Sequence, residues 1–119
     1  MIYLSEKLIE KNEYSNAVSN LLEALEKSNT SFRFVHNTKD IWMRDFMPVR
    51  TKSGRCVSFR YEPSYLSDTR GLCTEYRRDI SSQLEISVIY SDINLDGGNI
   101  VFSPSRNQAI ISDRVFLEN

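Results

Sequence analysis

The spacing of apolar residues along the chain predicts two helices. Between Asn12 and Lys27, apolar side chains recur at three- and four-residue steps with charged residues between them, which is typical of a helix with one buried face. The apolar positions of this face are Tyr14, Ala17, Val18, Leu21, Leu22 and Leu25. A similar period returns between Thr69 and Leu84, so we expect a second helix there, with Gly71 weakening its first turn.

Short strands are predicted where apolar and polar residues alternate or where β-branched residues cluster. Residues 55–61 alternate most clearly, and the segment 41–50 is expected to be an edge strand or the start of one, because Pro48 lacks an N–H. The other predicted strands are residues 1–4, 31–35, 85–90, 100–102 and 108–112. Strands that alternate with helices in this order indicate one domain of the α/β class.

Composition and charge narrow the classes of function. The chain has 119 residues, enough for one domain with one core. Its 15 basic and 16 acidic residues give a formal net charge of −1, which argues against nucleic-acid and membrane partners. No apolar run approaches the roughly 20 residues that cross a bilayer. Because the N-terminus also lacks the basic n-region of a secretory signal, we predict a cytoplasmic protein.

The residues that most often carry redox or metal chemistry are few. Cys56 and Cys73 are the two cysteines, and without an export signal we expect both to be reduced thiols. His36 is the single histidine, and the cysteines do not have CxxC spacing. The sequence therefore predicts no zinc site and no other metal.

The segment IWMRDFMP, residues 41–48, combines an aromatic residue, a charge pair and a proline. The Asp45 carboxylate can accept paired hydrogen bonds from a planar guanidinium group. Trp42 can cover the flat cation by a cation–π contact of about 0.5–2 kcal/mol. A structural interpretation stays open, in which Asp45 pairs with Arg44 or Arg50 and Trp42 lies in the core. Arg44 itself could bind a substrate carboxylate or hold the loop through an ion pair.

The segment LDGGNI, residues 95–100, places a carboxylate before two glycines between predicted strands. This arrangement suits a site where the backbone must approach a ligand closely, and Asp96 would supply the charge. The alternative is a plain hairpin, because Asp-Gly is a strong hairpin dipeptide.

Taken together, WMRDFMP, LDGGNIVFSP and AIISDRVFLEN resemble the agmatine deiminase and bacterial peptidylarginine deiminase family in their order, spacing and context. The resemblance extends from about Phe34 to Asn119. It implies a pentein fold, in which ββαβ-type units surround a central channel, and this chain would supply only the first units. The fold class expected is therefore α/β, a partial pentein.

The resemblance also implies a reaction and a set of residues. The family hydrolyses a guanidinium group to a ureido group and ammonia through a cysteine thiolate, a histidine and two carboxylates, and without a cofactor. By position, Asp45 matches the catalytic carboxylate that binds and orients the guanidinium group. Trp42 matches an aromatic residue beside the substrate, and Asp96 matches the acidic residue of the carboxylate-Gly-Gly segment. The implied partner is a small guanidinium compound of the agmatine or arginine type.

Two hypotheses follow from what the chain does not contain. The His-x-Asp segment and the C-terminal nucleophilic cysteine of the family are expected beyond Asn119, so the chain would be an N-terminal portion that is inactive alone. Cys56, Cys73 and His36 are poor replacements, because no activating neighbour is apparent in the sequence. The alternative is a shortened, non-catalytic module that binds a cationic ligand or a partner. We also expect a homo-oligomer, because open strand edges and the apolar run Val115–Leu117 invite pairing.

Overall fold

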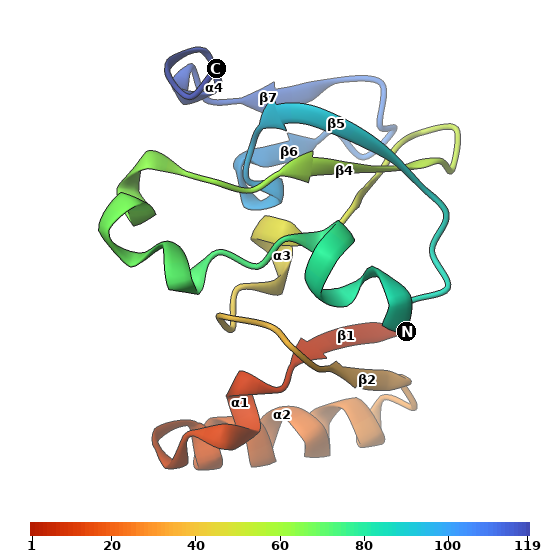
Figure 1. The fold of residues 1–119 in the computed structure, drawn as a ribbon. Helices are drawn as coiled ribbons and strands as arrows, with labels where there is room; N and C mark the ends of the chain where they lie inside the picture. The colour runs from red at the N-terminus through yellow and green to blue at the C-terminus, as the bar shows by residue number, and fades with distance from the viewer.

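A parallel two-stranded sheet and one helix form the N-terminal part of the chain. In this computed structural model, which describes residues 1–119 with every side chain except that of Arg70, β1 (Ile2–Ser5) pairs in parallel with β2 (Phe32–Val35). The connection runs through the short helix α1 (Lys7–Glu10), a 3-10 turn and helix α2 (Ser15–Lys27), and α2 lies against the sheet on the outer side of the molecule (Figure 1). The predicted helix is thus confirmed, with its first turn in 3-10 form.

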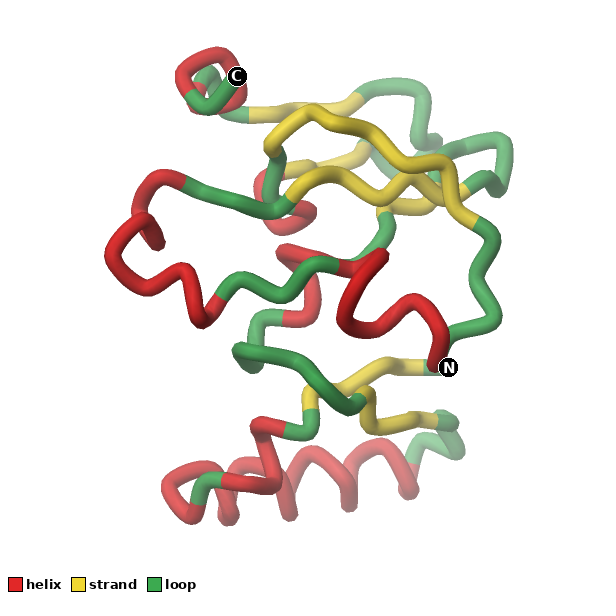
Figure 2. Tube along the Cα trace, in the orientation of Figure 1, coloured by secondary structure: helices red, strands yellow, loops and turns green.

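Two further small sheets form the other side of the molecule, which makes the fold a mixed α/β structure. The central sheet has the order β3-β4-β5, in which β3 (Val49–Arg50) is antiparallel to β4 (Cys56–Arg60) and β4 is parallel to β5 (Val88–Asn94). The last two strands, β6 (Ile100–Phe102) and β7 (Ala109–Ile111), form an antiparallel pair. Figure 2 shows these strands gathered at one end, with helical segments between them and the N-terminal sheet.

The predicted helix over residues 69–84 is wrong. The chain instead forms a kinked 3-10 segment, η2 (Ser64–Leu72), then a π-helical turn, η3 (Tyr76–Ile80), and a 3-10 turn, η4 (Ser81–Gln83). The break is explained by Thr74, whose buried hydroxyl accepts a hydrogen bond from the Lys39 N–H at 2.8 Å and so holds residues 73–75 away from a helical path. The apolar period still marks the buried positions, because Tyr76, Ile80 and Leu84 all lie in the core.

Strand β5 begins three residues later than predicted and ends four residues later. Leu84 has an extended backbone and leaves η4 toward the core, so residues 85–87 serve as a connection. Val88 pairs with Cys56, and the pairing continues until Asn94 lies opposite Arg60, with a register shift after Phe59. This pairing ends β5 immediately before residues 95–100, the second of the two candidate segments.

Two apolar clusters hold the layers together. The larger cluster lies between the N-terminal sheet and the central sheet, and its buried members are Val35, Phe46, Tyr61, Tyr76, Ile80 and Leu84. The smaller cluster joins the central sheet to the β6-β7 pair and consists of Val49, Leu95 and Ile100. Phe46 ties the short helix α3 (Met43–Phe46) to the larger cluster, and its ring lies 6.0 Å from that of Tyr61 between centroids. The candidate segment is therefore fixed by the core.

Large apolar side chains are exposed near the C-terminus. Helix α4 (Arg114–Leu117) leaves Phe116 and Leu117 more than four-fifths exposed, and Ile110 on β7 is 75% exposed.

We expect the chain to self-associate, because strand β7 presents an uncharged edge beside these side chains. Sedimentation velocity over a concentration series should show a sedimentation coefficient that rises with concentration. A monomer at every concentration would contradict this expectation, and a Phe116→Ser, Leu117→Ser variant should shift the equilibrium toward the monomer.

Candidate functional site

The two segments that were singled out in the sequence meet in space. Helix α3 carries Arg44 and Asp45, and the 3-10 turn η5 (Gly97–Asn99) follows Asp96 directly after β5. Residues 43–46 are one helical turn rather than the strand that was expected. Residues 97–99 form a turn between β5 and β6, as predicted, in 3-10 form. The two strands lie in different sheets, so the alternative of a plain hairpin is wrong.

Arg44 joins the two segments. Its Nε donates to the Gly97 carbonyl at 3.1 Å and its Nη2 donates to the Ile100 carbonyl at 3.0 Å. The expected ion pair of Arg44 is not found among the described residues, and these bonds to backbone oxygens hold the loop instead. A guanidinium donor bound to two carbonyls fixes η5 against α3, because hydrogen bonds from charged donors are stronger than neutral ones.

The two glycines are required by the close approach of the two segments. A side chain at Gly97 would overlap the carbonyl oxygen of Arg44, and one at Gly98 would overlap the Asp45 carboxylate. Neither glycine has a positive φ, so the requirement is for space rather than for backbone freedom. The approach allows the Gly98 N–H to donate to the Asp45 carboxylate.

Asp45 is a half-buried carboxylate close to another acid. Burial raises the pKa of Asp45, the charge of Asp96 raises it further, and the Gly98 N–H lowers it in part. Among the described residues no ion pair involves Asp45, so the structural interpretation in which it pairs with Arg44 or Arg50 is wrong. The carboxylate keeps acceptor capacity beyond the single backbone bond.

Asp96 lies at the end of a chain of two tyrosines. The Tyr65 hydroxyl donates to Asp96 Oδ2 at 3.0 Å, and the Tyr61 hydroxyl is hydrogen-bonded to Tyr65. Burial raises the pKa of Asp96, although the Tyr65 hydrogen bond and the charge of Arg114 act against this rise. Burial also raises the pKa of Tyr61 strongly, so its hydroxyl stays protonated as a donor.

The tyrosines and Arg114 were missed by the sequence reasoning. Arg114 donates to Glu118 at 3.1 Å and to Ser64 at 3.0 Å. Its guanidinium carbon also lies 4.9 Å from the centre of the Tyr65 ring. The four-residue spacing of Tyr61 and Tyr65 around Pro63 was the available signal, because it places two phenols near the end of a strand.

Trp42, three residues before Asp45, supplies an exposed aromatic surface. Its side chain is 62% exposed, so the interpretation in which it is a core residue is wrong. Its carbonyl accepts the Asp45 N–H at 3.0 Å and thereby begins the turn of α3. The indole is therefore available to a ligand.

The cysteines and the histidine are placed by other elements. Cys56 lies in β4, and Cys73 packs against the larger apolar cluster; both are thiols, as predicted. His36 is exposed, and its Nδ1 lies 2.8 Å from Glu6 Oε2 at the ends of β2 and β1. No three His, Cys, Asp or Glu side chains among the described residues are grouped so that they could hold a metal ion. No described helix is both long enough and apolar enough to cross a membrane.

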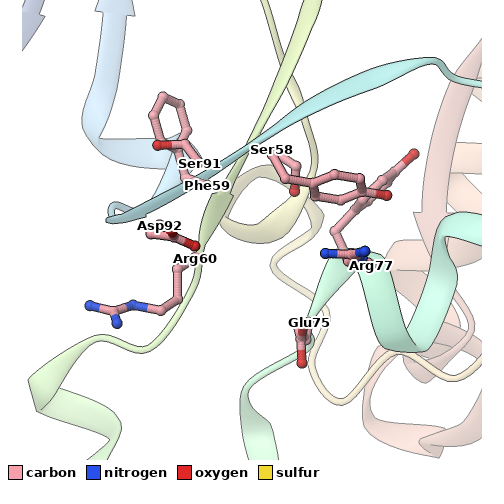
Figure 3. Close-up of a pocket in the computed structure, with 9 residues that line it drawn as sticks. Ser58, Phe59, Arg60, Glu75, Arg77, Ser91 and Asp92 are labelled. Atoms are coloured by element: carbon pink, nitrogen blue, oxygen red, sulfur yellow. The ribbon is translucent and has the colours of Figure 1, made fainter.

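A hollow of about 160 Å³ lies elsewhere, between strands β4 and β5 and the segment that carries Glu75 and Arg77 (Figure 3). Arg77 lies against the ring of Tyr90, at 4.9 Å from its centre. Neither Asp45 nor Asp96 lines this hollow. The carboxylates thus form a separate site beside α3 and η5.

The raised pKa values predict how stability depends on pH. Asp45 and Asp96 bind protons in the folded chain at a higher pH than in the unfolded chain. Proton binding by these two carboxyls therefore stabilises the fold fully at a pH below their pKa in the unfolded chain, about 4. This stabilisation is lost as the pH rises through their pKa in the folded chain. A carbon-13 titration should place both midpoints above that of Asp79, whose pKa the Arg78 hydrogen bond lowers. If Asp45 and Asp96 titrate at or below the pH at which Asp79 titrates, their pKa values are not raised and the expected pH dependence of stability is wrong.

Comparisons of the chain with protein-family models, with curated proteins and with solved structures found no match.

Proposed function

We propose that Asp45 and Asp96 together bind the guanidinium group of a small substrate, and that the chain is the substrate-binding portion of a guanidine deiminase. The observation that carries the proposal is the junction of α3 and η5, where two half-buried carboxylates with raised pKa values lie within electrostatic reach of each other. A cation between them would relieve both the mutual repulsion and the cost of burial. A planar guanidinium group fits this role because it donates in parallel to a carboxylate.

Three further features support a guanidinium ligand in particular. The Gly98 N–H occupies one lone pair of Asp45 and orients the carboxylate, which leaves other acceptor sites for a ligand. The Tyr65 hydroxyl donates to Asp96 Oδ2 and orients that carboxylate in the same way. The exposed Trp42 indole is available to cover the flat face of the cation.

The reaction proposed is hydrolysis of the guanidinium group of agmatine or of an arginine residue to a ureido product and ammonia. In the agmatine and peptidylarginine deiminase family, which the two motifs resemble, a thiolate attacks the guanidinium carbon and a histidine moves protons. Asp45 would hold the guanidinium nitrogens for that attack, and no cofactor is needed. A partial pentein is the corresponding proposal for the fold, and the mixed α/β architecture with several small sheets is compatible with it.

Calorimetric titration of the 119-residue chain with agmatine tests the proposal. We expect saturable binding, and putrescine should bind at least about tenfold more weakly, because an ammonium group cannot donate in parallel to one carboxylate. Binding should release protons, since the cation lowers the raised pKa values of the two carboxyls. Equal affinity for agmatine and putrescine, or no binding of either, would refute a guanidinium site.

We expect binding without turnover in residues 1–119. The sequence contains no His-x-Asp segment, and covalent catalysis requires an activated thiolate. Incubation with agmatine and with an arginyl peptide should give no ureido product above the buffer blank. Turnover that disappears in Cys56→Ala or Cys73→Ala would contradict this expectation. Binding without turnover also fits the alternative of a non-catalytic module that binds a cationic ligand.

A further inference from the structure

Three arginines line a second hollow, which borders Gly98 of the η5 turn and strands β3 and β6. The hollow has a volume of about 490 Å³, and Arg44, Arg50 and Arg106 line it. The remaining lining residues are apolar apart from Gly98, and none of the described residues that line it is acidic. This concentration of positive charge contrasts with the net charge of −1 for the whole chain.

Two of the three guanidinium groups are held in place by the fold. Arg44 is fixed through its bonds to the Gly97 and Ile100 carbonyls. Arg106 donates from Nη1 to the Arg50 carbonyl at 2.6 Å, and its guanidinium carbon lies 5.5 Å from the centre of the Phe102 ring. Because these groups are already ordered, an anion that binds between them loses less conformational entropy of the side chains.

The backbone at Arg106 is also unusual. Its φ is 54°, in the left-handed region that residues with a side chain rarely occupy. The turn is closed by the Arg106 N–H, which donates to the Ser103 carbonyl at 2.8 Å. The conformation directs the Arg106 side chain back to β3, where its guanidinium group meets the Arg50 backbone.

The charges of the three arginines are not neutralised within the hollow. Among the described residues, no ion pair involves Arg44, Arg50 or Arg106. Arg44 attracts the charge of Asp45, but the Asp45 carboxylate lies against Gly98 and does not line the hollow. Like charges brought together without a counter-charge repel one another, and an anion in the hollow would remove this repulsion.

We propose that this hollow binds a phosphate dianion, either inorganic phosphate or the phosphate group of a small monoester. A tetrahedral phosphate offers separate oxygens to three guanidinium groups, whereas a carboxylate offers two oxygens and one charge. The site goes beyond the proposed guanidinium site, because it uses cations rather than carboxylates and does not require Asp45 or Asp96 to bind anything.

Calorimetric titration at constant ionic strength tests the proposal with inorganic phosphate, methyl phosphate and acetate. We expect phosphate to saturate the chain at concentrations below about 10 mM and to bind at least about tenfold more tightly than acetate. The ratio of the two phosphate affinities distinguishes free phosphate from a monoester as the better ligand. Affinity that is equal for phosphate and acetate, or absent for phosphate, would overturn the proposal.

Arg50→Gln and Arg106→Gln should each weaken phosphate binding by about fivefold or more, because each removes one charged donor. Arg33→Gln is the matched control, since Arg33 is also an exposed arginine on a strand but does not line the hollow. It should leave the phosphate affinity within about twofold. If Arg106→Gln disturbs its turn, the Arg50→Gln variant decides the outcome. If the Arg50→Gln variant binds phosphate as tightly as the Arg33→Gln variant does, the proposed site is wrong. Phosphate binding that persists in Asp45→Asn would separate this site from the guanidinium site.

Discussion

Replacing Asp45 by asparagine is expected to weaken the binding of agmatine by about 100-fold while leaving the melting temperature nearly unchanged. Asparagine keeps the volume and one carbonyl-type oxygen, so the Gly98 N–H keeps an acceptor. The change removes the negative charge and half of the acceptor capacity toward a guanidinium group, and charge-assisted pairs of this kind are worth several kcal/mol when they are shielded from water. In a complete deiminase, kcat/KM should fall by a similar factor.

The stability of the same variant separates a binding role from a structural one. Loss of the Asp45 charge relieves its repulsion with Asp96, so unfolding should occur at the same temperature or slightly higher. Asp68→Asn is a suitable control, because Asp68 is an exposed aspartate outside the site. It should leave both the melting temperature and agmatine binding unchanged. An Asp45→Asn chain that unfolds more readily and still binds agmatine would show that Asp45 is structural.

Replacing Gly97 by alanine is expected to cost about 3 kcal/mol of stability, at the upper end for overpacking. The added methyl group would overlap the backbone carbonyl oxygen of Arg44, and a backbone atom cannot turn away as a flexible side chain can. Helix α3 and η5 would have to separate, which would also lengthen the Arg44 bonds to Gly97 and Ile100. Urea denaturation measures the free energy of unfolding, and agmatine binding should weaken in parallel because Asp45 and Asp96 move apart.

Gly71→Ala is the matched control for this change. Nothing lies within 4 Å of the position that a methyl group would take at Gly71, and its φ is not positive. The substitution should be neutral or should stabilise the chain by up to about 1 kcal/mol, because alanine restricts the unfolded chain. If Gly97→Ala and Gly71→Ala have the same effect, the close approach of η5 to α3 does not govern stability.

The sequence predicted those features of the fold that depend on local patterns. The helix that ends at Lys27 follows from apolar residues on one face, and β4 follows from strict alternation. The predicted helix over residues 69–84 failed because a tertiary hydrogen bond from Lys39 to Thr74 overrides the apolar period. Such a bond joins residues far apart in the sequence, so no local pattern indicates it.

The sequence indicated the two segments of the candidate site but not how they meet. Asp45 with Trp42 in one segment indicated a cation site, and Asp96 before two glycines in the other indicated a close approach of the backbone to a ligand. Whether these residues bind a cation stays a prediction. That Arg44 would bind backbone carbonyls of the other segment was not predictable, because carbonyl groups have no sequence signature. The roles of Tyr61 and Tyr65 depend on where β4 ends relative to β5, which is set by the pairing register.

The parallel pairing of β4 with β5 affects how quickly the site can assemble. Parallel neighbours cannot be joined by a tight turn, and here residues 61–87 connect the two strands. Closing a loop of this length costs chain entropy before any strand contact compensates for it, whereas the hairpins β3-β4 and β6-β7 close locally. Tyr61 follows β4 and Asp96 follows β5, so the tyrosine chain and the second carboxylate meet only after that loop has closed. The hairpins are therefore expected to fold early, and the carboxylate pair to form among the last contacts of the chain.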